Sequence, residues 1–563
     1  MTKISGSDAM FQVLYDWGID HIYGFPGGSF DSTMNAIHNW RDKIKFIEVR
    51  HEGPGAVHLM NGLYDAKYDK TPMVAIVANV PTSRQDIDFF QAFDEKPWFD
   101  PVAVWNHQAK TAEAIPVLMD EAIRQAYQKK GPAVLILPKD FGWDKIEDNF
   151  RNNAAAHKIV PNFPAPRKEQ IDKALELIKE AKNPIVYFGH GAQDASAELK
   201  EFSDKFKMPL VSSVLGKGIV EDEFPAYMGS IGRVGAKPSN DIQTHADLVV
   251  WVGNNSPFSI FFFNPKAKVI QIDINSERLG KRHAVTVPIL ADSKKTLRAL
   301  IEAGEGRAES PLYKAALADR ENWEAWLESF NDSDEIPMRV EPIFDVINKK
   351  AANDAVFAVD VGNVNINFDR LMHLHDDQKW TTSGLYATMG YGAPAALAAA
   401  TIYPKREVWN LAGDGGFAMM NQELLTQARY NMHIINVVFT NETLGFIEAE
   451  QVDESHQPLS GVKLPDNDWA MSAEGMNVKG FTVRTKREFE DAVAAAQQME
   501  DPVLIDCKIT HDMPYSTELN TLDDPAFVAK YDAQALKPFS YFAGKYGVEA
   551  DAASDASEHT EAE

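Results

Sequence analysis

Two short apolar runs flank a helical stretch between positions 408 and 450. The first run, VWNLA, leads into the sequence GDGG at 413–416, and the second, at 433–440, ends before Asn441. Apolar runs of this length are typical of buried strands, and the spacing of apolar residues between them is typical of a helix. The stretch therefore predicts a β-α-β unit. Asp414 and Asn441 then lie at the carboxyl ends of neighbouring parallel strands, where ligands bind in such sheets.

The same alternation of helical and strand patterns recurs along the chain and predicts the α/β class. Strand-like runs include HIYGF, MVAIVANV and AVLILP in the first part, and PIVYFGHGA, LVVWVGN and KVIQIDIN in the middle. A Pro-rich stretch at 154–167 and an acidic stretch around 331–337 separate three regions. We therefore expect three doubly wound parallel-sheet domains, at 1–153, 168–330 and 338–548, followed by a disordered acidic tail at 549–563.

The composition is that of an ordinary globular protein. Hydrophobic residues make up 45% and charged residues 25% of the 563 residues, and no apolar run is long enough to span a membrane. A net charge of −26 repels nucleic acids and anionic lipids, so neither is an expected partner. The N-terminus lacks a secretory cleavage pattern and Cys507 is the single cysteine. We expect a cytoplasmic protein without disulfides.

The oxygen atoms at the two strand ends favour a hard cation. Asp414 supplies a carboxylate and Asn441 an amide oxygen, which are suitable ligands for Mg²⁺ or Ca²⁺. The glycines at 413–416 permit a tight turn before a helix, and backbone N–H groups at a helix N-terminus bind phosphate. Together these residues predict a diphosphate held through a metal ion, although a GDG triplet alone is also typical of an ordinary turn.

The GDG triplet followed at this spacing by Asn441 resembles the fingerprint of the thiamin-diphosphate-dependent enzymes of the pyruvate oxidase and acetolactate synthase family. The resemblance implies a site for thiamin diphosphate and Mg²⁺ in the third domain. The residues that it assigns to this site are Gly413, Asp414, Gly415, Gly416, Asn441 and, through its backbone carbonyl, Thr443. Asp414, Asn441 and Thr443 are the implied metal ligands.

Residues of the first domain match other parts of the family pattern. The run FIEVRHE ends in Glu52, where the family carries the glutamate that contacts the aminopyrimidine ring of the cofactor. Gly27 and Gly28 lie in a loop that the family places beside the thiamin ring, and Phe90-Gln91 resembles a pair that oxidases of the family place over the substrate. Taken singly, each is also explained by a solvated strand end, a plain turn or a chance pair.

Further matches lie in the third domain. Met389, in LYATMG, resembles the methionine that supports the bent shape of the cofactor, and core packing is its alternative role. After Asn441, the segment GFIEAE matches the family's GFI segment and its following acid. The match makes Phe446 and Ile447 walls of the substrate pocket and brings Glu450 towards the substrate.

The middle region lacks a complete GxGxxG motif, because GHGAQD at 189–194 has no third glycine. It nevertheless resembles the region through which flavin-binding members of the family contact FAD. The residues that this resemblance assigns to FAD are Gly189, Gly191, Arg233, Asn254, Asp273 and Asp292. Arg233 suits a phosphate or the flavin edge. The two aspartates suit the ribose and adenine side, with a solvated strand end as an equal alternative for each.

The first domain departs from the family after Glu52. In the family, a helix and a strand follow the strand that ends in RHE, and only then does a Gly-Pro-Gly turn open the next helix. Here Glu52 runs directly into GPG at 53–55. We therefore expect that the first domain lacks one helix-strand unit. Such a loss breaks backbone hydrogen bonds on both neighbouring strands, so activity depends on whether Glu52 still reaches the cofactor.

Outside this gap, the chain is similar to the FAD-containing pyruvate oxidases of lactic-acid bacteria. The resemblance implies oxidative decarboxylation of pyruvate with phosphate and O2 to acetyl phosphate, CO2 and H2O2. The implied cofactors are thiamin diphosphate, Mg²⁺ and FAD. The alternatives are an acetolactate-synthase-type carboligase and a non-catalytic deletion paralogue. The implied assembly is a homodimer or homotetramer, with the first domain of one subunit facing the third domain of its partner.

Overall fold

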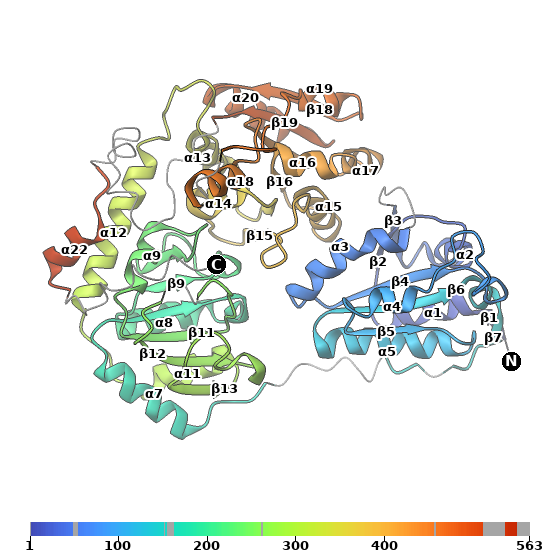
Figure 1. Cartoon of the computed structure of the whole chain (residues 1–563), viewed down its shortest axis with the longest axis horizontal. Coiled ribbons are helices and arrows are strands. Elements are labelled where there is room, and N and C mark those ends of the chain that lie inside the picture. The colour runs from blue at the N-terminus through green and yellow to red at the C-terminus, as the bar shows by residue number, and fades with distance from the viewer. Residues whose placement is uncertain are drawn as a thin grey trace. The chain divides into compact units, whose positions relative to one another are not determined.

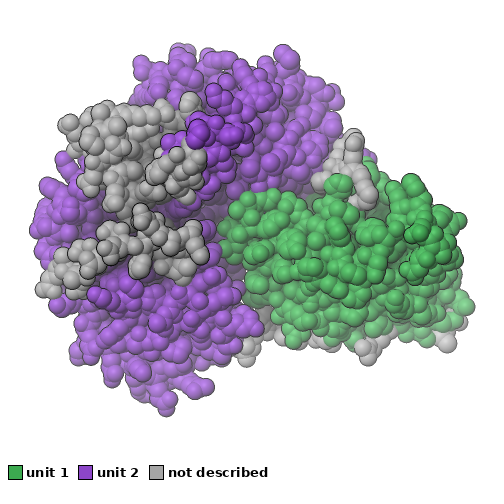
Figure 2. Space-filling model, viewed as in Figure 1, with its two compact units in different colours: residues 1–161, 383–388 green, residues 162–382, 389–563 purple. Residues whose placement is uncertain are grey.

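A computed structural model describes residues 2–48, 55–150, 152–154, 163–259, 263–454, 458–510 and 535–548. The chain divides into two compact units (Figures 1 and 2). Unit 1 comprises residues 1–161 and 383–388, and unit 2 comprises residues 162–382 and 389–563. Three domains were predicted from the sequence pattern, and unit 2 contains both the second and the third of these regions.

Unit 1 combines helices with short parallel sheets. Its helices are α1 (Gly6–Asp16), α2 (Asp31–Trp40), α3 (Gly55–Tyr68), α4 (Glu95–Phe99), α5 (Ala114–Lys129) and α6 (Lys139–Trp143). Its strands are β1 (Lys3–Ser5), β2 (His21–Gly24), β3 (Lys45–Glu48), β4 (Met73–Asn79), β5 (Trp105–Gln108), β6 (Pro132–Pro138) and β7 (Lys145–Glu147). The pair β2-β3 and the group β4-β6-β5 are parallel sheets, and β1 pairs antiparallel with β7.

Helix α1 shows how local sequence sets these elements. Ser5 caps it, because the Ser5 side chain accepts a hydrogen bond from the backbone N–H of Asp8 at 3.0 Å. The buried face of α1 includes Met10 and shares one apolar cluster with Met119 and Ile123 of α5. This layer packs beneath the strands and forms the core of unit 1.

The first sheet of unit 2 has six parallel strands in the order β10-β9-β8-β11-β12-β13. They are β8 (Pro184–Phe188), β9 (Leu210–Ser212), β10 (Tyr227–Ser230), β11 (Leu248–Val252), β12 (Lys268–Asp273) and β13 (Val287–Leu290). The accompanying helices are α7 (Lys168–Glu180), α8 (Ser196–Phe206), α9 (Lys237–Gln243), α11 (Ser293–Ala303) and α12 (Pro311–Glu328). Every residue of β8 and β11 is buried, which is typical of central strands in a parallel sheet.

The second sheet of unit 2 has the order β15-β14-β16-β17-β19-β18. Its strands are β14 (Val356–Val359), β15 (Lys379–Thr381), β16 (Val408–Gly413), β17 (Ile434–Thr440), β18 (Lys479–Val483) and β19 (Val503–Lys508). The helices are α13 (Val340–Lys350), α14 (Asn363–Leu371), α15 (Gly392–Ile402), α16 (Asp414–Met420), α17 (Glu423–Arg429), α18 (Gly445–Ala449), α19 (Trp469–Glu474) and α20 (Lys486–Ala496). The last described helix, α22 (Phe539–Tyr546), packs instead against α12 and the apolar cluster of the first sheet.

These elements confirm the α/β class that the sequence predicted. The predicted β-α-β unit is also present, as β16, α16, α17 and β17, with β16 and β17 paired in parallel. Cys507 is buried in β19. Among the described residues, no helix combines the length and the apolar character that crossing a membrane requires.

The parallel sheets of unit 1 and the second sheet of unit 2, called the last sheet below, have similar strand orders that differ by one central strand. In the last sheet, β16 lies between the pair β15-β14 and the group β17-β19-β18. In unit 1, the pair β3-β2 corresponds in chain order to β15-β14, and the group β4-β6-β5 corresponds to β17-β19-β18. No described strand joins the pair to the group. Strands β2 and β4 therefore each have an edge that no described strand covers. Residues 49–54, which connect β3 to α3, lie outside the described residues.

Candidate cofactor site

Asp414 lies where β16 passes into α16, and it is 4% exposed. Its Oδ1 accepts a hydrogen bond from the backbone N–H of Gly415, and its Oδ2 accepts one from the backbone N–H of Glu442, both at 2.9 Å. Glu442 follows β17 with φ of 60°, a left-handed conformation that is uncommon for glutamate. The fold thus brings Asp414 beside the segment that begins at Asn441.

Asp414 places an ionisable carboxyl group in a buried position. Burial raises the pKa of its carboxyl group to about 6, against the backbone N–H groups of Glu442 and Gly415, which lower it. A nearby cation favours the ionised form of a carboxylate and opposes the effect of burial. A buried carboxylate beside an amide side chain at two strand ends therefore fits a divalent cation with oxygen ligands.

Thr443 and Asn441 complete the predicted ligand set. The Asn441 Oδ1 accepts a hydrogen bond from the backbone N–H of Thr443 at 3.3 Å, and the Thr443 hydroxyl donates to Glu448 Oε2 at 2.7 Å. Among the described residues, no cluster of three or more His, Cys, Asp or Glu side chains is suited to hold a metal. The predicted ligand set contains one carboxylate, one side-chain amide and one backbone carbonyl, so it is not a cluster of that type.

Close packing explains two of the glycines that follow Asp414. A Cβ added to Gly415 would lie 2.7 Å from a Leu444 methyl carbon and 3.3 Å from the methyl carbon of Met389. A Cβ added to Gly416 would lie 2.8 Å from Asp360 Oδ1. Non-bonded atoms do not approach a carbon as closely as 2.7 or 2.8 Å, so a side chain at either position would force a neighbour to move. At Gly416 that neighbour is the Asp360 carboxyl group, which backbone hydrogen bonds hold in place, whereas at Gly415 the neighbours are the ends of flexible side chains. Met389, predicted to support the cofactor, thus lies next to the GDGG turn.

Sequence reasoning missed Asp360, which follows β14 and is 1% exposed. Its Oδ1 accepts hydrogen bonds from the backbone N–H groups of Val361 at 2.7 Å and Gly390 at 2.9 Å, and its Oδ2 accepts one from Gly392 at 3.1 Å. Burial raises the pKa of Asp360. Asp360 fixes the backbone on the C-terminal side of Met389, and a charged residue directly after the apolar run AVFAV was the available signal.

The segment on the N-terminal side of Met389 packs within unit 1. Residues 383–388 belong to that unit, where Asn61 of α3 donates to the Thr388 hydroxyl at 2.9 Å and the Ser383 hydroxyl donates to Asp65. Tyr386 stacks on Tyr64 with ring centroids 5.8 Å apart. The chain therefore passes from unit 1 to unit 2 at Met389, and no sequence pattern indicated this.

Residues predicted for FAD and for the substrate meet within unit 2. The Arg233 guanidinium lies 3.3 Å from Glu450 Oε1 and stands over the ring of Phe446, 5.4 Å from its centroid. Phe446 and Ile447 are on α18, and the Ile447 side chain is 41% exposed. Arg233 itself belongs to the loop after β10. The loop predicted to contact the flavin thus touches the segment predicted to contact the substrate.

The other predicted FAD residues lie at carboxyl ends of strands in the first sheet of unit 2. The approach of β8 to β11 is so close that a Cβ on Gly189 would lie 2.8 Å from Asn254 Cγ, and one on Gly191 would lie 2.7 Å from a backbone oxygen. Asp273 ends β12, is 2% exposed and accepts from the backbone N–H of Asn275 at 2.8 Å. Asp292 caps α11, which is a structural role in itself.

The residues of unit 1 that were predicted to contact thiamin or substrate have few close neighbours or are exposed. Gly27 and Gly28 follow β2, and a Cβ added to either meets no atom within 4 Å, so packing does not require glycine there. Phe90 is 76% exposed, and Gln91 has φ of 61° in an exposed loop. Glu52 lies outside the described residues.

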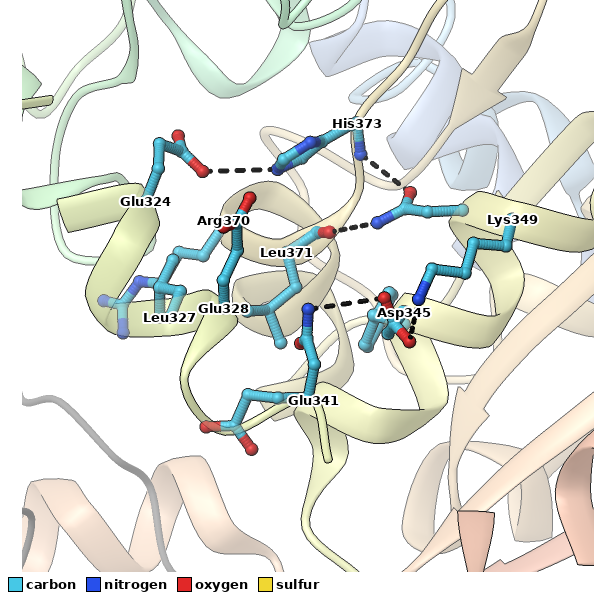
Figure 3. Close-up of a pocket in the computed structure, with 12 residues that line it drawn as sticks. Glu324, Leu327, Glu328, Glu341, Asp345, Lys349, Arg370, Leu371 and His373 are labelled. Atoms are coloured by element: carbon cyan, nitrogen blue, oxygen red, sulfur yellow. Dashed lines mark hydrogen bonds and ion pairs between the residues drawn. The ribbon is translucent and has the colours of Figure 1, made fainter. Parts of the chain in front are cut away.

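A separate cavity of about 160 Å³ lies between α12, α13 and α14 (Figure 3). Its lining is rich in charge, and several of the charged side chains pair with one another or with nearby residues. His373 lies 3.3 Å from Glu324, and Lys349 lies 2.7 Å from Asp345. Glu341 pairs with an arginine outside the cavity. None of the predicted site residues lines this cavity.

Comparison with known proteins identifies matches to three domain families. The C-terminal TPP binding domain of thiamine pyrophosphate enzymes matches residues 360–507, the central domain matches 171–300, and the N-terminal TPP binding domain matches 51–98. The pyruvate oxidase of Lactiplantibacillus plantarum is 39% identical over 586 aligned positions, covering 97% of each chain. An acetolactate synthase of Arthrospira platensis is 28% identical, covering 91% of this chain and 95% of its own.

Proposed function

Because this chain belongs to the thiamine pyrophosphate enzyme family, we propose that it is a pyruvate oxidase that uses phosphate and O2 and forms acetyl phosphate, CO2 and H2O2. The observation that carries the proposal is the contact of Arg233 with Glu450 and Phe446. An oxidase must pass electrons from the thiamin site to the flavin, and this contact joins the segments proposed to hold them. The similarity to a pyruvate oxidase over nearly the whole chain supports the same activity.

In this proposal the third domain holds thiamin diphosphate through Mg²⁺. Asp414, Asn441 and the Thr443 carbonyl bind the metal, and the helix N-terminus at Gly415 and Gly416 receives the diphosphate. The cofactor, when bound, supplies the carbanion chemistry that the side chains of a protein lack. The residues of the chain bind it, orient it and exclude water from it.

The proposed roles of the other site residues follow from where the family resemblance places them in the sequence. Met389, fixed by the anchor at Asp360, presses against the GDGG turn and supports the cofactor. Phe446 and Ile447 wall the substrate pocket, and Glu450 faces the substrate. Gly27 and Gly28 contact the thiamin ring, Phe90 and Gln91 cover the substrate, and Glu52 hydrogen-bonds the aminopyrimidine ring. The FAD residues are Gly189, Gly191, Arg233, Asn254, Asp273 and Asp292. We also propose a cytoplasmic homodimer or homotetramer.

One experiment separates the oxidase from a carboligase. The purified protein, loaded with thiamin diphosphate, Mg²⁺ and FAD, is mixed with pyruvate without oxygen while flavin absorbance is followed. An oxidase bleaches its flavin, and admitting O2 then restores the colour with formation of H2O2. A flavin that keeps its colour while acetolactate accumulates contradicts the proposal and supports the carboligase. Repeating the aerobic assay without phosphate identifies the acetyl acceptor.

Arg233 offers a test of the proposed FAD site. Exposed ion pairs contribute less than about 1 kcal/mol, so Arg233→Ala should leave the free energy of unfolding nearly unchanged. FAD affinity should fall about tenfold, because a charge-assisted hydrogen bond to the cofactor is lost. Titration of the apoprotein with FAD measures this affinity. Arg298→Ala is the control, since the Arg298 side chain is 39% exposed, against 40% for Arg233, and pairs with Glu201 and with the buried Glu198 in the same domain. Equal FAD affinity in both variants contradicts the assignment.

A non-catalytic paralogue is the second candidate, favoured by the edges of β2 and β4 that no described strand covers. The alignment with the L. plantarum pyruvate oxidase spans 586 positions, more than the 563 residues of this chain, so that relative carries residues that this chain lacks. We propose that they include a helix-strand unit after Glu52. Titration with thiamin diphosphate and Mg²⁺ tests the consequence. Stoichiometric binding with turnover of pyruvate contradicts the paralogue, and FAD binding without thiamin diphosphate binding supports it.

A further inference from the structure

The loop that carries Arg233 is held through its backbone. It comprises residues 231–236, between β10 and α9, and the Asn240 side-chain amide of α9 binds both backbone polar groups of Gly232. The Asn240 Oδ1 accepts from the Gly232 N–H at 2.9 Å, and the Asn240 Nδ2 donates to the Gly232 carbonyl at 3.1 Å. Asn240 is 3% exposed. The loop is therefore fixed on the domain that contains it.

Arg370 holds the same loop from the domain of the second sheet. It lies on α14, where it also borders the cavity of Figure 3, and it is 7% exposed. Its Nε donates to the Gly235 carbonyl at 3.0 Å, and its Nη2 donates to the Arg233 carbonyl at 3.1 Å. The preceding residue, Asp369, accepts a hydrogen bond from the hydroxyl of Ser230, directly before the loop. Two adjacent side chains of α14 thus bind the loop and its start.

Arginine is suited to this contact because its guanidinium is planar and its N–H donors point in fixed directions. One side chain can therefore bind two carbonyl groups of the same turn and hold them at a set separation. A lysine has the same charge, but its donors rotate and set no such separation. Both bonds of Arg370 go to the backbone of the loop. They fix where Arg233 stands and leave its side chain to other partners.

The other end of α14 packs against the segment that carries Phe446 and Glu450. Asn363 is the first residue of α14, and a Cβ added to Gly445 would overlap with the amide group of its side chain. Helix α14 has nine residues, so its two ends lie about 12 Å apart. The segment after Gly445 and the loop with Arg233 meet where Arg233 lies 3.3 Å from Glu450. One helix therefore contacts both sides of this ion pair.

We propose that Arg370 is a positioning residue that fixes Arg233 against Phe446 and Glu450 for contact with FAD. The inference rests on the proposed function, in which Arg233 binds the flavin cofactor. Arg370 acts through the backbone carbonyls of Arg233 and Gly235 and does not touch the cofactor itself. Its contribution to FAD binding is therefore limited to that of the Arg233 side chain.

Two variants and two controls test the proposal in the full chain. Arg370→Met removes both hydrogen bonds and keeps an unbranched side chain, and Arg370→Lys keeps the charge without the planar group. The same two substitutions at Arg307 are the controls, because Arg307 also donates to two backbone carbonyls, those of Ile178 and Ala181 at the end of α7. Each variant is made with Arg233 intact and again with Arg233→Ala.

The affinity of the apoprotein for FAD is the first measured quantity, with folding checked by urea denaturation. Arg370→Met should weaken FAD binding about fivefold and Arg370→Lys about threefold, whereas neither Arg307 variant should change it. In the Arg233→Ala background the same Arg370 changes should cost less than about twofold, because the side chain that Arg370 positions is absent. Should the methionine variant not fold, the two lysine variants decide.

Three results of the FAD titrations overturn the proposal. The first is an unchanged FAD affinity in the folded Arg370 variants. The second is an equal loss in the Arg307 variants, which would show that any arginine bound to backbone carbonyls has this effect. The third is the same loss with and without the Arg233 side chain, because Arg370 would then act on FAD by another route.

Hydrogen exchange of the peptide 231–236 separates failure of this proposal from failure of the proposed function. The N–H groups of Gly232, Gly235 and Ala236 are hydrogen-bonded, so their exchange reports opening of the loop. Exchange should be faster in the Arg370 variants than in the wild type and the Arg307 variants, and equal exchange overturns the role of Arg370. The expected exchange and FAD affinities, without reduction of the flavin by pyruvate, retain that role and reject the pyruvate oxidase assignment.

Discussion

Replacing Asp414 with asparagine should weaken Mg²⁺-dependent binding of thiamin diphosphate by about 100-fold or more, because loss even of a group supporting a ligand costs about 10–100-fold. The same change should alter the pH dependence of apoprotein stability. Burial raises the folded-state pKa of Asp414 from 3.8 to about 6, so between these values the folded state binds more protons than the unfolded state. Wild-type stability contributed by this group therefore falls as pH rises through that window.

The amide that Asp414→Asn introduces cannot ionise, so the variant should lack this fall. Relative to the wild type, it should gain up to about 3 kcal/mol between pH 4 and pH 7. Urea denaturation of the apoprotein at several pH values measures the gain, and calorimetric titration with thiamin diphosphate and Mg²⁺ measures binding. Asp376→Asn, at a side chain that is 60% exposed, is the control. Wild-type binding by Asp414→Asn would remove Asp414 from the metal site.

The second large effect is expected at Asp360. Asp360→Ala should lower the free energy of unfolding of unit 2 by about 3 kcal/mol or more, because it leaves the buried N–H groups of Val361, Gly390 and Gly392 without their acceptor. Asp360→Asn should lose less, since one acceptor oxygen remains. Urea denaturation followed by tryptophan fluorescence measures both changes.

Asp360→Ala should also weaken thiamin diphosphate binding under conditions in which the variant is folded. The anchor on one side of Met389 is lost, so the methionine no longer presses against the GDGG turn. Asp354→Ala is the control, because Asp354 precedes the same strand and its side chain is 52% exposed. Its effect should stay within about 0.5 kcal/mol. A fully stable Asp360→Ala variant would show that solvent reaches these N–H groups.

Strand ends were the part of the site that the sequence revealed. Asp414 and Asn441 follow long apolar runs, and the carboxyl ends of neighbouring parallel strands meet at one edge of a sheet. The glycines of the turn were equally readable, and Leu444 and Asp360 approach two of them closely. The α/β class followed from the same alternation of apolar runs and helical patterns.

Side chains that act on distant backbone could not be predicted in this way. The run AVFAV marks Asp360 as a strand-end charge, but its partners are N–H groups about thirty residues further along the chain, and backbone groups leave no trace in a sequence. The pairing of Arg233 with Glu450 joins two domains, and only packing brings them together.

The edges of β2 and β4 that no described strand covers also have a mechanical consequence. In the last sheet of unit 2, β16 links its neighbours through continuous ladders of backbone hydrogen bonds, so a force across the sheet must break many bonds together. In unit 1, the pair β2-β3 is connected to the other strands by helix packing, with α1 against α5 and α2 against α6. Packed helices slide past one another in small steps. Unit 1 should therefore yield first under load, by shear along these helices.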